Sequence, residues 1–265
     1  MNKIDYRGYQ IMICTRSMNL QLYFKSMILL NIPCQKKRFC NTTAEGYIYE
    51  LLKEDVDYVI NIDEDAFVLD QKSLFSLLDY IIDNDYINCG MPDGGVLPIR
   101  THNPLVTNPF FNIINIKRIK EKINIKDIEN VQFNRYDYLD IFPKKLTGDY
   151  DFDNFEPYNR IFLWIALNFK TLYLDAITHK DQISTILLNQ NREPILYHSW
   201  YSRFYNKDTY HTKRINDLFL ECEMINGIKA DRYIYFIIKQ LFIEINRKSK
   251  RLYFRKMKLI KAKLF

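Results

Sequence analysis

Residues 57–68 read DYVINIDEDAFV, an apolar, strand-like segment that ends in three consecutive acids. In an extended chain successive side chains point to opposite faces, so Asp63 and Asp65 are expected on one side and Glu64 on the other. Two carboxylates then converge on one spot. Like charges this close disfavour each other's ionised form unless a cation lies between them. The stretch therefore predicts a site for a hard divalent cation, Mg²⁺ or Mn²⁺, which oxygen ligands suit.

The same acids have a simpler interpretation. An acidic triplet after a strand also serves as a solvated loop or as the cap of the next helix. The next helix is predicted by apolar residues at helical spacing, which are Leu74, Leu77, Leu78, Ile81 and Ile82. Asp70 precedes this helix and is sufficient as its cap, which leaves Asp63 and Asp65 free for the cation site.

Strands and helices alternate in the first third of the chain. Strands are predicted over 9–14, 37–41 and 56–62, with helices over 20–30 and after residue 45. Because parallel strands need crossover connections, this order predicts an α/β fold with a Rossmann-like, mostly parallel sheet and helices on both faces. Ligands in such sheets bind beyond the carboxyl ends of the strands, which is where Asp63 and Asp65 lie.

Residues 92–109 form a long irregular segment between two further predicted strands. Long loops in compact domains are usually functional or disordered. The polar side chains of Asp93, Arg100 and His102 are therefore candidates for binding an acceptor substrate. A plain surface loop is the alternative.

A second group of acids, Asp149, Asp151, Asp153 and Glu156, precedes Pro157 and a predicted apolar helix. Acids before a helix N-terminus are favoured by the helix dipole, which is the structural explanation. The functional explanation makes Asp153 or Glu156 a general base that takes a proton from a hydroxyl group.

His198 ends the apolar run 194–198 and is flanked by aromatic residues. A histidine in such a place is commonly a hydrogen-bonded core residue. Its position after the last predicted strand also suits a third metal ligand or a phosphate contact.

Composition limits the class of protein and its location. The chain has 265 residues, 48% of them hydrophobic, and five cysteines without a C-x-x-C pair. The odd number argues against a disulfide framework and a zinc ribbon, so a reducing cytoplasm is expected. Residues 1–10 lack the apolar core of a signal peptide, and no apolar run reaches transmembrane length.

The C-terminal segment 245–265 is strongly basic within a chain of net charge +6. It holds nine basic residues and no acid, and its apolar residues Tyr253, Met257, Ile260 and Leu264 share one helical face. We expect a helical extension, 206–265, whose tail binds an anionic membrane surface at the inner face of the membrane. The alternatives are a helix that packs on the domain and a nucleic-acid arm. Nucleic acid is not the expected partner because no readout motif is present.

Taken together, these features resemble the GT-A type of nucleotide-sugar glycosyltransferases, particularly small bacterial enzymes of surface-polysaccharide synthesis. The resemblance covers about residues 8–205, a GT-A-like catalytic domain assigned to 1–205. It is carried by the opening strand YQIMIC at 9–14, by the D-x-D of Asp63 and Asp65, by the acidic stretch DFDNFE at 151–156 and by His198.

The resemblance implies a nucleoside diphosphate sugar, of the UDP or GDP type, bridged by Mn²⁺ or Mg²⁺ to Asp63, Asp65 and His198. It also implies a glycan or lipid-linked acceptor, deprotonated by Asp153 or Glu156. Thr15 and Arg16 are expected to bind the donor, although the strand that they end lacks the family's familiar proline and asparagine opening. Inversion or retention at the sugar is left open.

Two other functions agree with the residues. Nucleotidyl or phosphoryl transfer also uses paired aspartates on metals, but the glycine-rich phosphate loops G-x-x-x-x-G-K-[ST] and G-x-G-x-x-G do not occur. A non-catalytic carbohydrate-binding protein attached to the membrane through its tail is the other alternative.

Overall fold

The computed structural model describes residues 3–30, 36–40 and 42–227, and only the isolated helical positions 238, 242, 245, 249 and 252 thereafter. The chain divides into two compact units, 1–227 and 228–265. The first unit extends beyond the boundary predicted at residue 205. The apolar face predicted for the basic tail lies outside the described residues.

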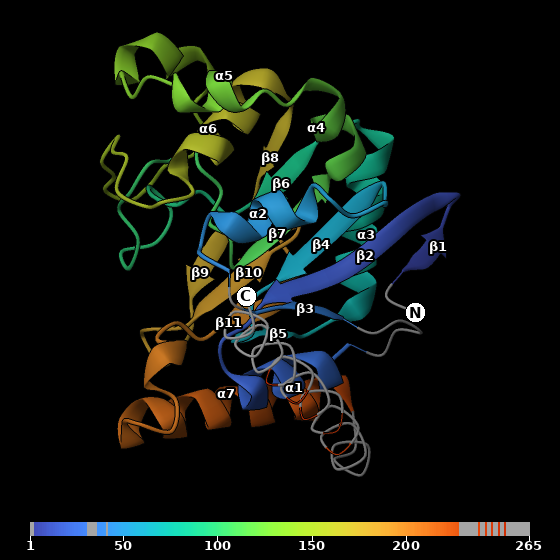
Figure 1. Cartoon of the computed structure of the whole chain (residues 1–265). Helices are drawn as coiled ribbons and strands as arrows, with labels where there is room; N and C mark the ends of the chain where they lie inside the picture. The colour runs from blue at the N-terminus through green and yellow to red at the C-terminus, as the bar shows by residue number, and fades with distance from the viewer. Residues whose placement is uncertain are drawn as a thin grey trace, which may run out of the picture. The chain divides into compact units, whose positions relative to one another are not determined.

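A seven-stranded sheet forms the centre of the first unit (Figure 1). Its strands are β1 (Ile4–Tyr6), β2 (Tyr9–Arg16), β3 (Lys37–Phe39), β4 (Tyr58–Ile62), β6 (Asn88–Gly90), β7 (Phe111–Asn115) and β8 (Thr171–Tyr173). The order is β1-β2-β4-β7-β6-β8, and β3 pairs with β2. β2 is parallel to β3 and β4, and β6 is parallel to β8, as a βαβ order requires.

The sheet is mixed, whereas the sequence predicted a mostly parallel one. β7 runs antiparallel to both β4 and β6, and β1 runs antiparallel to β2. The direction of β7 follows from the connection between β6 and β7. It is the irregular loop 92–109 and contains no crossover helix, so the chain returns in the opposite direction.

A second, smaller sheet was not foreseen. Its strands are β5 (Ala66–Val68), β9 (Ala176–Thr178), β10 (Thr185–Leu188) and β11 (Pro194–His198), all antiparallel in the order β5-β11-β10-β9. β5 follows the acidic triplet, and its partner β11 carries His198. The register pairs His198 with Ala66, which brings the histidine next to Asp65.

The helices are α1 (Leu20–Ile28), α2 (Gly46–Leu51), α3 (Gln71–Asp83), α4 (Ile116–Lys122), α5 (Ile125–Glu129), α6 (Asn159–Asn168) and α7 (Thr209–Asn226). Two short 3₁₀ helices, η1 (Arg135–Ile141) and η2 (Ser202–Phe204), complete the described elements. None of the helices in the described part of the chain has both the length and the apolar character needed to cross a bilayer.

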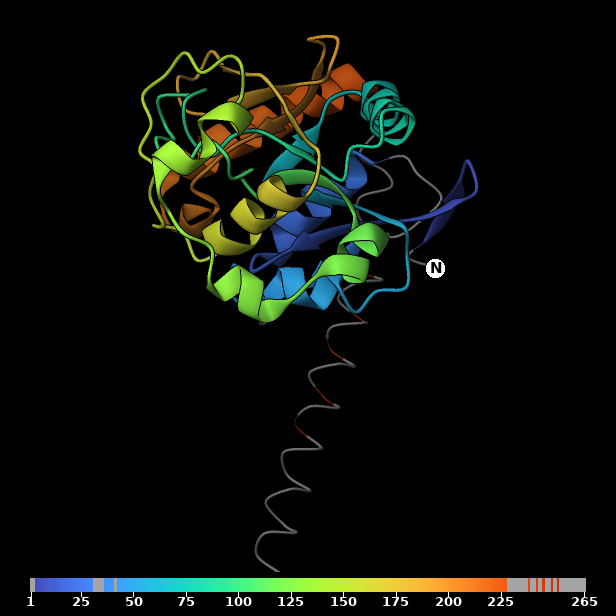
Figure 2. The same cartoon turned by 90° about the horizontal axis from the view of Figure 1, so that it is seen from above.

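Helices cover both faces of the large sheet, as the sequence predicted. Side chains of β2 alternate between two cores: Ile11 and Ile13 pack with α3 and the small sheet, and Met12 packs with α2, α4 and α6. Figure 2 shows α3 (teal) and α2 (light blue) on opposite sides of the sheet. The Asp70 carboxylate accepts hydrogen bonds from the Lys72 and Ser73 amides and caps α3, as predicted.

Candidate functional site

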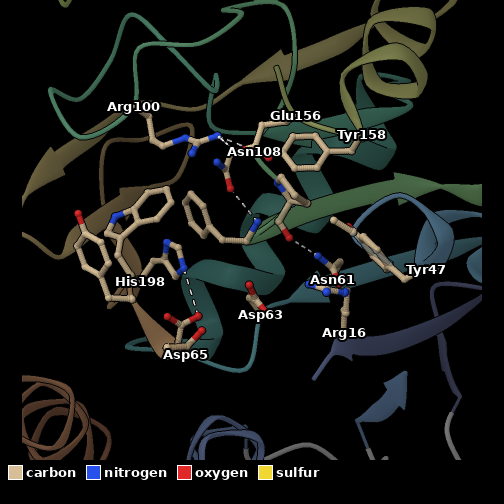
Figure 3. A pocket seen from close by; sticks show the side chains of 16 residues that line it. Arg16, Tyr47, Asn61, Asp63, Asp65, Arg100, Asn108, Glu156, Tyr158 and His198 are labelled. Carbon is tan, nitrogen blue, oxygen red and sulfur yellow. Dashed lines mark hydrogen bonds and ion pairs between the residues drawn. The ribbon is translucent and has the colours of Figure 1, made fainter. Parts of the chain in front are cut away.

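A cavity of about 230 Å³ lies at the carboxyl end of β4 (Figure 3). Its lining residues come from both sheets and from the loops between them: Arg16, Ala44, Tyr47, Asn61, Asp63, Asp65, Arg100, Asn108, Pro109, Phe110, Glu156, Tyr158, His198, Trp200, Tyr201 and Ser202. Six residues predicted from the sequence belong to this lining, namely Arg16, Asp63, Asp65, Arg100, Glu156 and His198. Thr15, Asp93, His102 and Asp153 do not.

The acidic triplet is a turn, not the extended segment that the sequence predicted. β4 ends at Ile62, and the Ala66 amide then donates to the Asp63 carbonyl at 3.2 Å. Asp63 and Asp65 nevertheless face the same cavity, because the turn brings them together. Glu64 points away, as expected, and accepts hydrogen bonds from the Ser17 hydroxyl at 2.7 Å and the Asn19 amide at 2.6 Å.

His198 completes a group of three candidate metal ligands. Ligand atoms of Asp63, Asp65 and His198 all lie within 4.8 Å of one another. His198 Nε2 is 3.2 Å from Asp65 Oδ1. Neighbouring ligands of an octahedral ion with bonds of about 2.1 Å are about 3 Å apart, so this separation suits two ligands of one cation. The Phe110 ring stacks on His198 with centroids 4.3 Å apart and holds its orientation.

The two aspartates differ in protonation behaviour because their neighbours differ. Burial, together with the nearby Asp65 charge, raises the pKa of Asp63 to about 6. Burial acts in the same direction on Asp65, but His198 and a hydrogen bond from the Ser199 hydroxyl, at 3.0 Å, outweigh it and lower the pKa of Asp65. Asp65 therefore favours its ionised form more strongly than Asp63 does.

Lys36 lies behind the acidic turn and was missed by the sequence prediction. Its side chain is buried, and its Nζ donates to the Ser26 hydroxyl at 2.7 Å. Ser26 in turn donates to the Ala66 carbonyl at 2.8 Å. Burial lowers the pKa of Lys36 to about 7. The hydrogen bonds of Lys36 and Ser26 connect α1 and the segment before β3 to the acidic turn. No local pattern in the sequence indicates this connection.

Arg100 crosses one wall of the cavity and is held from behind by Asp93. The guanidinium makes two hydrogen bonds to the Asp93 carboxylate, at 2.8 and 2.7 Å, and one to Glu156 Oε1 at 2.8 Å. Asp93 itself is fully buried. Its role as a direct acceptor contact stays a prediction. In the structure its carboxylate holds Arg100, because a bidentate carboxylate fixes a guanidinium in one orientation.

His102 and Asp153 form a separate pair outside this cavity. Asp153 Oδ2 lies 2.8 Å from His102 Nδ1, and the His102 ring stacks on Phe155. Their predicted roles as acceptor contact and base therefore find no support in the cavity lining. Thr15, predicted to bind the donor, is also buried and does not line the cavity, although its neighbour Arg16 does.

Aromatic residues form much of the wall and were not predicted as site residues. Tyr47 comes from α2, Tyr158 precedes α6, and Trp200 follows β11. The Trp200 ring packs on His198 with centroids 4.2 Å apart. Trp200 could have been found from the sequence, because it is one of the aromatic residues that flank His198. Tyr47 and Tyr158 lie far from His198 along the chain, so no pattern in the sequence placed them in the site.

No family model and no curated protein matches this chain. Among solved structures, the "Crystal Structure of A197 from STIV" is similar over 70% of this chain and 93% of that chain, with 13% identity and a TM-score of 0.37. A likeness at that score carries no argument about fold or function, so function rests on the geometry above.

Proposed function

We propose that this chain is a metal-dependent glycosyltransferase that transfers a sugar from a nucleoside diphosphate sugar to a glycan or lipid-linked acceptor. The convergence of Asp63, Asp65 and His198 in one cavity supports this proposal most strongly. Two guanidinium groups, Arg16 and Arg100, line the same cavity; in Figure 3 Arg16 lies beside Asp63 and Arg100 lies at the top of the view. A site that combines a cation-binding anionic end with two guanidinium groups suits a diphosphate.

The donor set fits Mn²⁺ or Mg²⁺. Two carboxylates supply hard oxygen ligands, and the imidazole of His198 supplies a nitrogen that Mn²⁺ accepts readily. A bound cation would neutralise the charge that develops on the diphosphate leaving group. Asp65 and His198 are held in place without it, through Ser199 and Phe110 respectively.

The chain's own residues account for binding and proton transfer. Arg16 and Arg100 bind phosphate oxygens, and the aromatic walls exclude water from the cavity. Glu156 accepts the proton of the acceptor hydroxyl. Arg100 engages Glu156 through Oε1 and so orients the carboxylate, which leaves Oε2 for the acceptor. Between the two bases predicted from the sequence, the cavity lining favours Glu156.

Nucleotide-dependent thermal stabilisation tests the proposal directly. With Mn²⁺ present, UDP or GDP at about one hundred times its dissociation constant should stabilise the fold by about 2.7 kcal/mol, which scanning calorimetry measures as a raised Tm. EDTA should remove the effect. Stabilisation by a nucleoside triphosphate, with release of pyrophosphate, would instead indicate nucleotidyl transfer. A Tm insensitive to every nucleotide would leave the carbohydrate-binding alternative.

The affinity for Mn²⁺ should fall by up to about tenfold per pH unit as the pH decreases below about 6. Asp63, whose pKa is raised to about 6, must lose its proton before it binds a cation. Above this pH Asp63 is already ionised, so its contribution to the pH dependence vanishes. Titration calorimetry across this range measures the slope. Asp63→Asn is the control, since its slope should be shallower, and identical slopes for the two proteins would contradict the assignment.

Membrane association stays a proposal from the sequence of the basic tail. We propose that residues 245–265 hold the enzyme at an anionic surface, where a lipid-linked acceptor would lie. Flotation with anionic liposomes, with and without these residues, measures the contribution. Equal flotation of the two proteins would contradict it.

A further inference from the structure

A group of aromatic rings lies at the rim of the cavity and has no role in the chemistry above. Tyr201, Phe204, Tyr210 and His211 form this rim cluster. His211 is its centre, with ring centroids 4.9 Å from Tyr201, 5.5 Å from Phe204 and 5.2 Å from Tyr210. The other three remain exposed, Tyr201 and Phe204 by 38% each and Tyr210 by 59%. Such a contiguous aromatic surface differs from isolated exposed residues, which need no explanation.

Two consecutive residues at the cluster, Trp200 and Tyr201, have a strained backbone conformation. Their rings point to different parts of the site. Trp200 and Tyr201 both have left-handed conformations, with φ of 56° and 57°. Bulky residues rarely adopt this conformation, and where they do the surroundings hold them. Here Arg214 Nη2 of α7 donates to the Trp200 carbonyl at 3.2 Å. The Trp200 ring packs against His198, while Tyr201 lines the cavity and joins the rim cluster.

The rim cluster is continuous with the cavity through Tyr201. Tyr201 and Ser202 belong to the cavity lining, and Phe204 follows on the same 3₁₀ helix, η2. Tyr210 and His211 belong to the first turn of α7. The rim cluster therefore adjoins, through Tyr201, the cavity that Glu156 also lines.

We propose that the rim cluster binds a carbohydrate, namely the glycan part of the acceptor. The proposal rests on the proposed function. A sugar ring has an apolar face of C–H groups and a polar edge of hydroxyls, and it needs a surface with both properties. The cluster offers ring faces for the first and the polar groups of two tyrosines and a histidine for the second.

Binding to a printed array of defined oligosaccharides tests the proposal. The wild-type protein should bind at least one class of them, and calorimetry with the best binder should give an affinity reduced by about fivefold to tenfold in Phe204→Ala and in Tyr210→Ala. Phe204→Leu should be reduced in the same way, because it keeps the apolar surface but not the ring. Tyr136→Ala is the matched control, since Tyr136 is 81% exposed on η1 and should bind as wild type.

The outcomes separate this proposal from the proposed function. Absence of binding to every oligosaccharide, or full affinity in Phe204→Leu, would overturn the carbohydrate assignment even if UDP or GDP stabilises the protein with Mn²⁺. Oligosaccharide binding that depends on Phe204 and Tyr210 would support the assignment, even if nucleotides have no effect and the transferase proposal fails.

Discussion

Asp65→Asn is expected to weaken Mn²⁺ binding by at least about 100-fold and to abolish metal-dependent sugar transfer. Asp65 is 1% exposed and is the aspartate whose pKa is lowered, so it contributes a full negative charge at neutral pH. An amide at this position supplies one neutral oxygen instead. Calorimetric titration with Mn²⁺, and an assay of sugar release from the donor, measure the two losses.

The fold of Asp65→Asn should be intact. The amide oxygen can still accept the hydrogen bond from the Ser199 hydroxyl, and loss of the charge removes repulsion from Asp63. The pKa of Asp63 should therefore move back toward its usual range, which carboxyl NMR titration detects. Asp57→Asn, at the other end of β4, is the matched control and should bind Mn²⁺ as wild type. Full transfer activity in Asp65→Asn, with an unchanged circular dichroism spectrum, would refute the metal assignment.

Glu156→Gln is expected to reduce turnover by about 10² to 10⁴ while leaving the affinity for Mn²⁺ and UDP or GDP nearly unchanged. Glutamine keeps an oxygen for the hydrogen bond from Arg100, so the cavity wall should stay in place. It cannot accept the proton of the acceptor hydroxyl. Steady-state kinetics with a saturating donor isolates this loss in kcat.

Asp153→Asn is the matched control for Glu156, since both acids were predicted as bases from the same stretch of sequence. Asp153 pairs with His102 and does not line the cavity, so its variant should retain most of the wild-type turnover. The opposite result, an active Glu156→Gln and an inactive Asp153→Asn, would transfer the role of base to Asp153 and would require a different acceptor position.

Local patterns in the sequence determined the individual elements. Residues 9–14 predicted a strand, and β2 sends alternate side chains into two cores. The helical spacing after Asp70 predicted α3 and its cap. These features follow from periodicity and short-range hydrogen bonds, which a single segment contains in full. The α/β class and the helices on both faces followed from the order of such segments.

Only the tertiary structure decided how distant segments meet. The antiparallel direction of β7, and the pairing of β5 with β11 that places His198 beside Asp65, depend on strand register between segments far apart in the chain. Burial of Lys36 behind the acidic turn and the separation of Glu156 from Asp153 are also products of packing. The sequence by itself indicated the candidate ligands Asp63, Asp65 and His198 as residue types suited to a cation. Their convergence came from long-range pairing and packing, which no local periodicity records.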